Sequence, residues 1–319
     1  MESYAFRTKY DELGFFQKND DDCILYLHDQ YFPKQKQIKW SKWDKYRIDY
    51  PDTIPPTTTN DLIGKAVSFF LWSENFNVIP DIVEFAKTPK AGSFHPRTNR
   101  GSAGLFSKLA RGASVIDEVR SYYNIVEAME ELFKVIEPDV KNINVFGHRI
   151  REVLTIACTE VEYLLLQYLK ENNFPPPHKD RYNTSHYVKV LDAIGLNKFE
   201  VSLKMHPAMG VFSPFKAWSK DKPTESLAWY SAYNATKHDR GGNFYKATLG
   251  ALVNAVSAIH ILLEAQYGSQ LFDKPMQSQF ESCFFTRERC KWSLSEIHVP
   301  ILNYDDSFTW EQKTGYFQV

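Results

Sequence analysis

The stretch I-R-E-V-L-T-I-A-C-T-E-V-E-Y-L-L-L-Q-Y, residues 150–168, carries the clearest structural pattern in the chain. Its apolar residues recur at intervals of three and four, which places them on one face of an α-helix. The helix is predicted over residues 144–172, where two asparagines and the proline run 175–177 end it. Cys158 lies within the apolar face and is predicted to be buried in the core.

Further helices are predicted on both sides of this one. Asn60 and Asp61 provide an N-terminal cap for a helix to about residue 75. Caps, apolar spacing and stop signals predict four more helices, over residues 114–136, 185–194, 224–237 and 243–267. Short strands are predicted at 23–27, 199–205, 282–286 and 297–302.

These elements predict a mainly α protein with short peripheral strands. The predicted division has an N-terminal α+β part with a linker at 1–113, a helical core at 114–267 and a C-terminal extension at 268–319. The segment 38–50 interleaves basic and aromatic residues. Such a segment could clamp single-stranded nucleic acid, but a half-buried or edge strand with solvated lysines is the favoured prediction.

Composition excludes several classes of function. The 319 residues carry a net charge of −1, so any contact with nucleic acid needs a local basic patch. The four cysteines and nine histidines show no zinc-ligand spacing, and no phosphate-binding loop motif is present. No metal and no cofactor are therefore predicted.

The chain is expected to be cytoplasmic, with no contact to a membrane. Its N-terminus is charged throughout, unlike a signal peptide. The longest apolar stretch, residues 249–263, is interrupted by polar residues. It is also shorter than the roughly 20 residues that cross a bilayer.

The segment W-Y-S-A-Y-N-A-T-K-H-D-R, residues 229–240, is the candidate functional site. In a helix, Asn234 and His238 lie one turn apart on the same face. His238 suits general acid or base catalysis, and Lys237 or Arg240 suits a phosphate. Asn234 could orient the imidazole or bind a phosphate oxygen. These parts would suffice to cleave RNA without a metal.

A structural role explains most of the same residues. Lys237, His238 and Arg240 are favourable at the negative end of a helix dipole, and Gly241-Gly242 would end the helix. Asn234 is the exception, because asparagine is a poor helix former. The sequence therefore leaves open whether the site is catalytic.

Two pairs of charges border the apolar face of the 144–172 helix. Arg149 and Glu160 lie along one flank, and Arg151 and Glu162 lie along the other. Glu160 is predicted to face the helix that carries Asn234 and His238, as an ion-pair or supporting residue. Arg151 and Glu162 are predicted to be surface charges.

These segments resemble the HEPN superfamily of α-helical domains, many of which carry an R-N-x-x-x-H motif near the end of a helix. Asn234 to His238 matches N-x-x-x-H, and Tyr233 occupies the arginine position. The segments 148–162, 212–218 and 229–240 together are similar to a group of uncharacterised bacterial proteins. The resemblance covers about residues 114–267.

The resemblance implies a HEPN-like helical bundle that pairs as a homodimer, with both motifs facing one cleft. It implies binding of RNA or a nucleotide, and metal-independent ribonuclease activity in a toxin or defence context. His238, Asn234, Lys237 and Arg240 would be catalytic, and Tyr233, Arg149 and Glu160 would assist binding. The alternative is a non-catalytic interaction or scaffold module in which the same residues are structural.

Overall fold

The computed structural model describes residues 1–28, 34–53, 55, 57–76, 81–100, 113–175, 181–272, 280–313 and 315–317. The fold is mixed α/β, with 44% of residues in helices and 19% in strands. The prediction of a mainly α, HEPN-like bundle with only peripheral strands is therefore wrong. The main reason is an N-terminal five-stranded antiparallel sheet, of which the sequence patterns revealed a single strand.

The chain forms two compact units, each assembled from separated stretches. Unit 1 comprises Met1–Phe94, Arg100–Leu105 and Trp292–Lys313. Unit 2 comprises His95–Asn99, Phe106–Lys291 and Thr314–Val319. The division predicted from the sequence, with boundaries at residues 113 and 267, had three continuous parts and did not predict that each unit combines separated stretches.

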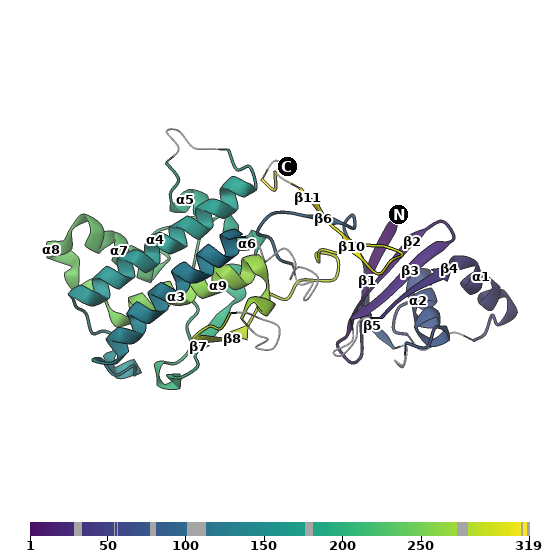
Figure 1. Cartoon of the computed structure of the whole chain (residues 1–319), viewed down its shortest axis with the longest axis horizontal. Helices are drawn as coiled ribbons and strands as arrows, with labels where there is room; N and C mark the ends of the chain where they lie inside the picture. The colour runs from purple at the N-terminus through teal and green to yellow at the C-terminus, as the bar shows by residue number, and fades with distance from the viewer. Residues whose placement is uncertain are drawn as a thin grey trace. The chain divides into compact units, whose positions relative to one another are not determined.

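Unit 1 is built on the five-stranded sheet (Figure 1). The order is β4-β3-β2-β1-β5, and every neighbouring pair is antiparallel. Asp11 and Asp20 adopt left-handed backbone conformations in the two tight connections between the first three strands, as short polar residues can. The strand bounds are β1 Glu2–Thr8, β2 Leu13–Asn19, β3 Asp22–His28, β4 Lys34–Lys39 and β5 Ile82–Lys87.

Helices α1, Trp40–Asp49, and α2, Leu62–Ser73, cover one face of this sheet (Figure 1). The Asp61 carboxylate caps α2 by accepting the backbone N–H of Ile63 at 2.8 Å, as predicted. The predicted strand over 38–50 is wrong beyond Lys39. Trp43 and Tyr46 are three residues apart, and a helix directs both toward α2, where Tyr46 stacks on Phe69 at 4.3 Å.

The C-terminal segment of unit 1 covers the other face of the sheet. Gln17 donates to the Pro300 carbonyl at 2.6 Å and accepts the Leu302 N–H at 2.9 Å, which fixes the segment in register. Further along the segment, Gln35 donates to the Asn303 carbonyl and Gln37 donates to the Tyr304 carbonyl. The short strands here are β6 Ser93–Phe94, β9 Ile301–Leu302, β10 Phe308–Thr309 and β11 Glu311–Gln312.

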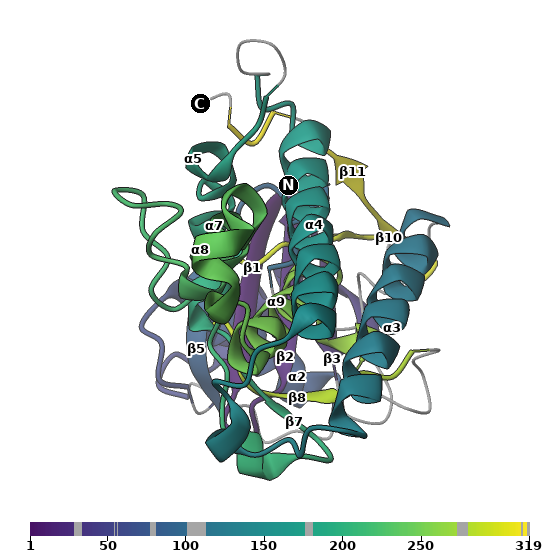
Figure 2. The ribbon, with the colours of Figure 1, turned by 90° about the vertical axis from the view of Figure 1, so that its left-hand side faces the viewer.

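Unit 2 is a helical assembly around α9, Leu249–Tyr267. Three helices lie side by side against α9: α3 Ala113–Phe133, α4 His148–Glu171 and α7 Ala228–His238 (Figure 2). The apolar face predicted for α4 is buried as expected, including Cys158. Helix α9 is buried on nearly every side, as a central helix must be.

The hydropathy of α9 is explained by its place in the core. Among the described residues, α9 has the length and hydropathy of a helix that could cross a membrane. However, 89% of its apolar stretch is buried inside the protein. It was predicted to start at Asn243 but starts at Leu249, where Thr248 accepts the Ala251 N–H at 3.2 Å. Residues 240–246 instead form α8, Arg240–Asn243, and the 3-10 turn η6, Phe244–Lys246.

Short elements complete unit 2. The predicted helix over 185–194 is divided into α5, Thr184–Tyr187, and α6, Val190–Ala193. The predicted strands at 199–205 and 282–286 pair as β7, Glu200–Leu203, and β8, Phe284–Glu288. The described residues also form the 3-10 turns η2 Val140–Asn142, η4 Leu196–Lys198, η5 Pro207–Met209 and η7 Ser269–Leu271.

Candidate functional site

Helix α7 turns one face into unit 2 and leaves the predicted polar residues on the other. Trp229, Tyr230, Tyr233 and Thr236 are buried at helical spacing, and the Trp229 indole donates to the Pro214 carbonyl at 2.9 Å. Asn234 is half-buried, and Lys237, His238 and Arg240 are exposed. We call these last four residues the α7 cluster.

Two members of the α7 cluster make no hydrogen bond within the described part of the chain. These are the side chains of His238 and Asn234. The helix ends at His238 because Asp239 leaves helical geometry and caps α8 by accepting the Gly242 N–H at 3.1 Å. Gly241 and Gly242 therefore lie inside α8 and do not form the predicted stop. His238 is free to meet a ligand.

Tyr233, at the position of the HEPN arginine, holds Lys237 in place. Its hydroxyl accepts a hydrogen bond from the Lys237 ammonium at 3.0 Å, and that ammonium lies 5.1 Å from the ring centre. This hydrogen bond raises the pKa of Lys237, so the side chain stays charged at neutral pH. Tyr233 is only 2% exposed, and an arginine in its place would be buried.

The glutamate that faces α7 is Glu162, not Glu160. The Tyr230 hydroxyl donates to Glu162 at 2.6 Å. Glu160 instead accepts a hydrogen bond from Ser121 on α3 at 2.7 Å, and burial raises its pKa. Residues 160 and 162 are separated by about 200° around a helix, so the two carboxylates meet different neighbours. Glu160 faces α3, so the prediction that it faces and supports the α7 cluster is wrong.

Replacing Tyr230 by phenylalanine tests the link between α4 and α7. Loss of a partly buried hydrogen bond to a carboxylate is expected to lower the free energy of unfolding by about 1.5–3 kcal/mol. The Tyr245 hydroxyl makes no hydrogen bond in the described chain and its ring is 58% exposed, so Tyr245→Phe is the matched control. Urea unfolding of both variants gives the comparison, and equal midpoints would contradict this role of Tyr230.

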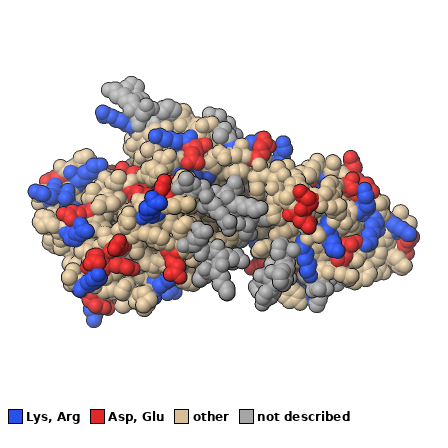
Figure 3. All heavy atoms as spheres, viewed as in Figure 1, with Lys and Arg blue, Asp and Glu red and all other residues tan. Residues whose placement is uncertain are grey.

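Arg149 lies at the start of α4, next to the segment that follows α7. The His148 ring lies 4.6 Å from that of Phe244 in η6, which joins these two regions. Arg149 forms an exposed ion pair with Glu152 at 3.1 Å. Gly147 provides no side-chain cap for α4, so the positive end of its dipole adds to the basic character of this region. Figure 3 shows basic side chains, interspersed with acidic ones, over the end of unit 2 that carries α7 and α8.

Comparisons with protein-family models, with curated proteins and with solved structures give no match.

A second polar network, not predicted from the sequence, lies inside unit 2. Ser282 lies 2.8 Å from His260 Nδ1, and Thr286 lies 2.9 Å from His260 Nε2. Thr286 also donates to Glu264 at 2.6 Å, and Arg289 donates to the same carboxylate. The serine, histidine and glutamate are each at most 5% exposed, so a substrate could not reach them. Their role in this arrangement is structural.

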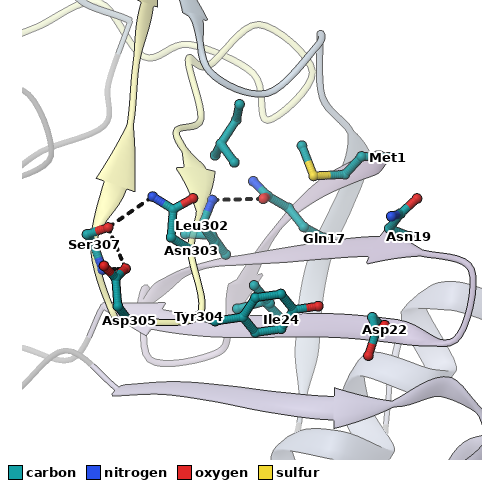
Figure 4. A pocket seen from close by; sticks show the side chains of 11 residues that line it. Met1, Gln17, Asn19, Asp22, Ile24, Leu302, Asn303, Tyr304, Asp305 and Ser307 are labelled. Atoms are coloured by element: carbon teal, nitrogen blue, oxygen red, sulfur yellow. Dashed lines mark hydrogen bonds between the residues drawn. The ribbon is translucent and has the colours of Figure 1, made fainter.

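A hollow of about 440 Å³ lies in unit 1 between the sheet and its C-terminal segment (Figure 4). Several of its polar groups are already used within the protein: both amide atoms of Gln17 bind the segment, and Asp305 accepts from Ser307. Asp22 forms an ion pair with Lys39 at 2.6 Å. Within the described ranges, no group of three or more His, Cys, Asp or Glu residues could hold a metal. The α7 cluster is therefore the strongest candidate site.

Proposed function

We propose that unit 2 binds RNA through the α7 cluster and cleaves it without a metal ion. The observation that carries this proposal is that His238 ends α7 as an exposed side chain with no hydrogen bond to the described residues, with Lys237 before it and Arg240 two residues after it in the chain. An imidazole can donate or accept a proton in catalysis. The two cations would offset the charge that develops on a phosphate.

The proposed step is an internal transfer within the RNA. The ribose 2′-hydroxyl attacks the adjacent phosphorus, the new O2′–P bond forms and the P–O5′ bond breaks. His238 accepts the proton of the attacking hydroxyl or donates one to the departing oxygen. The products are a 2′,3′-cyclic phosphate and a 5′-hydroxyl end. Asn234 orients the imidazole or a phosphate oxygen, and Arg149 extends the basic surface.

This chain has Tyr233 where the HEPN motif has an arginine, and in this proposal Lys237 supplies the positive charge of that arginine. Tyr233 holds the Lys237 ammonium at 3.0 Å, so Tyr233 would position the cation. A HEPN-like homodimer, a bacterial toxin or defence context and a cytoplasmic location are further parts of the proposal, supported by sequence resemblance and composition.

The competing function is a non-catalytic interaction module in which the α7 cluster is structural. That function requires His238 and Asn234 to be tied into a hydrogen-bond network or a dimer contact. Within the described chain neither side chain has a hydrogen-bond partner, and Glu160 lies against α3 instead. The free histidine favours the nuclease over a structural network within one chain.

The test is incubation of the purified protein with total RNA in EDTA, together with the His238→Ala variant. The parent is expected to release fragments with 5′-hydroxyl ends, which a polynucleotide kinase labels. Loss of a general acid or base lowers the cleavage rate by about 10²–10⁴-fold. Because His238 is exposed and unbonded, its replacement should change the free energy of unfolding by no more than about 0.5 kcal/mol.

The matched control is His206→Ala. His206 is a half-buried histidine of unit 2 that packs against Phe133 at 5.0 Å, outside the α7 cluster. This variant should cleave as the parent does. Equal cleavage by parent and His238→Ala, or a large fall in melting temperature for His238→Ala, would refute the assigned role of His238.

A further inference from the structure

We propose that Phe146, Phe244 and Tyr245 form a stacking site for unpaired bases of the RNA. We call these three residues the aromatic platform. The inference rests on the proposed function, since it identifies the bound form of the RNA as single-stranded. It concerns residues that follow α7 and precede α4, outside the α7 cluster itself.

The platform is held together by backbone contacts between distant parts of the chain. Residues 143–146 run beside the start of α9, where Leu249 N–H donates to Val145 and Gly250 N–H donates to Ile143, both at 2.8 Å. A Cβ atom on Gly250 would lie 2.6 Å from the Ile143 side chain, so the close approach requires glycine there. Phe146 is thereby fixed next to η6.

Two rings of the platform, Phe146 and Phe244, are in contact, and Tyr245 follows Phe244 directly in η6. The ring centres of Phe146 and Phe244 lie 5.7 Å apart, edge to face. The ring of His148, the first residue of α4, lies 4.6 Å from that of Phe244. Phe146 is 48% exposed and Tyr245 is 58% exposed. Large apolar rings left in water at fixed positions mark an interaction surface.

One lysine lies at the Tyr245 ring, and an arginine precedes the platform in α8. Lys246 lies 6.0 Å from the Tyr245 ring, and neither Lys246 nor Arg240 has an ion-pair partner in the described chain. The nearby carboxylates are occupied, because Asp239 caps α8 and Glu152 pairs with Arg149. Aromatic faces interspersed with free cations suit single-stranded nucleic acid, whose bases stack while its phosphates bind the cations.

A second copy of the chain is the other occupant to consider. A two-fold interface centred on the aromatic platform would bring Lys246 toward the like charge of its own copy in the partner, so any homodimer is expected to pair through another surface. A polyanion meets no such repulsion. Charge complementarity therefore favours RNA on this surface.

The test measures binding of a fluorescent oligoadenylate by the full-length protein, with inorganic polyphosphate as a probe that has charge but no bases. Phe146→Ala and Tyr245→Ala are each expected to weaken oligoadenylate binding roughly five- to hundredfold, because each removes one stacking surface. Binding of polyphosphate should be unchanged. Phe285→Ala is the matched control, since Phe285 is 54% exposed on β8 of the same unit.

The outcomes separate this inference from the proposed function. Unchanged oligoadenylate affinity in Phe146→Ala and Tyr245→Ala would overturn the stacking site, even if His238→Ala still abolishes cleavage. Equal losses for oligoadenylate and polyphosphate would also overturn it. A parent dimer that dissociates in Phe146→Ala, with RNA affinity retained, would assign the surface to self-association. Stacking without any cleavage would sustain the binding site and refute the nuclease.

Discussion

Replacing Arg97 by methionine is expected to lower the free energy of unfolding of unit 2 by about 3–5 kcal/mol. The Arg97 guanidinium donates to Glu118 on α3 at 2.6 and 3.2 Å, to Gln266 on α9 at 2.8 Å and to Glu171 at 2.6 Å. The side chains of Arg97 and Glu118 are 3% and 1% exposed. Removing the arginine leaves the Glu118 carboxylate buried, without water or a counter-ion.

Hydrogen exchange of peptides from α3 and α9 provides the measurement, since it reports on unit 2 alone. Arg149→Met is the control, because it loses only an exposed ion pair worth about 0–1 kcal/mol. Adding Glu118→Gln to Arg97→Met should recover part of the loss, since it neutralises the buried charge. The glutamine still has an oxygen for the Tyr267 hydroxyl, which donates to Glu118 at 2.8 Å. Equal exchange in Arg97→Met and Arg149→Met would refute this account.

Replacing Glu264 by glutamine is expected to cost about 1.5–3 kcal/mol at neutral pH. The carboxylate is 2% exposed and accepts hydrogen bonds from Thr286 and Arg289. Burial alone would raise the pKa of Glu264, but His260, Arg289 and Thr286 more than offset burial and hold it below the usual value. The ionised form is therefore the one that stabilises the fold.

The sign of the pH dependence follows from this lowered pKa. The contribution of Glu264 is complete above its unfolded value, near pH 4.5, and is lost as the pH falls through the lower folded value. The difference in unfolding free energy between parent and Glu264→Gln should therefore shrink on acidification below about pH 4.5. Glu152→Gln, at an exposed pair, should show little difference at any pH. A constant difference for Glu264→Gln down to pH 3 would contradict the assignment.

Helices with one buried face were predictable, whereas most strands of the N-terminal sheet were not. The apolar positions from Ile150 to Tyr168 repeat with helical spacing because α4 packs on one side only. Strands β1 and β2 are buried on both faces for four consecutive residues, so their sequences lack the alternation that marks a strand. Strand β3 is buried in the same way but was predicted, because its residues 23–27 form an uninterrupted apolar run. The pairing of Gln17 with Pro300 joins residues too far apart for any local pattern to reveal.

The candidate site was predictable in part. The buried stripe of Trp229, Tyr230 and Tyr233 already directs Asn234 and His238 outward, as the structure has them. The choice between Glu160 and Glu162 was not predictable, because each lies on one flank of α4. Only the packing of α3 and α7 decides which flank meets which helix. Likewise, Phe146 meets Phe244 through a fold contact and not through sequence proximity.

The threading of the chain through its two units has a consequence for protein synthesis. The sheet of unit 1 leaves the ribosome first, but the segment that covers one of its faces, Trp292–Lys313, emerges only after every helix of unit 2. During that interval Phe15, Ile24 and Tyr26 have no covering partner. Unit 2 can form its core from residues already translated, whereas the nascent sheet exposes an apolar surface that a chaperone could bind until residues 292–313 emerge.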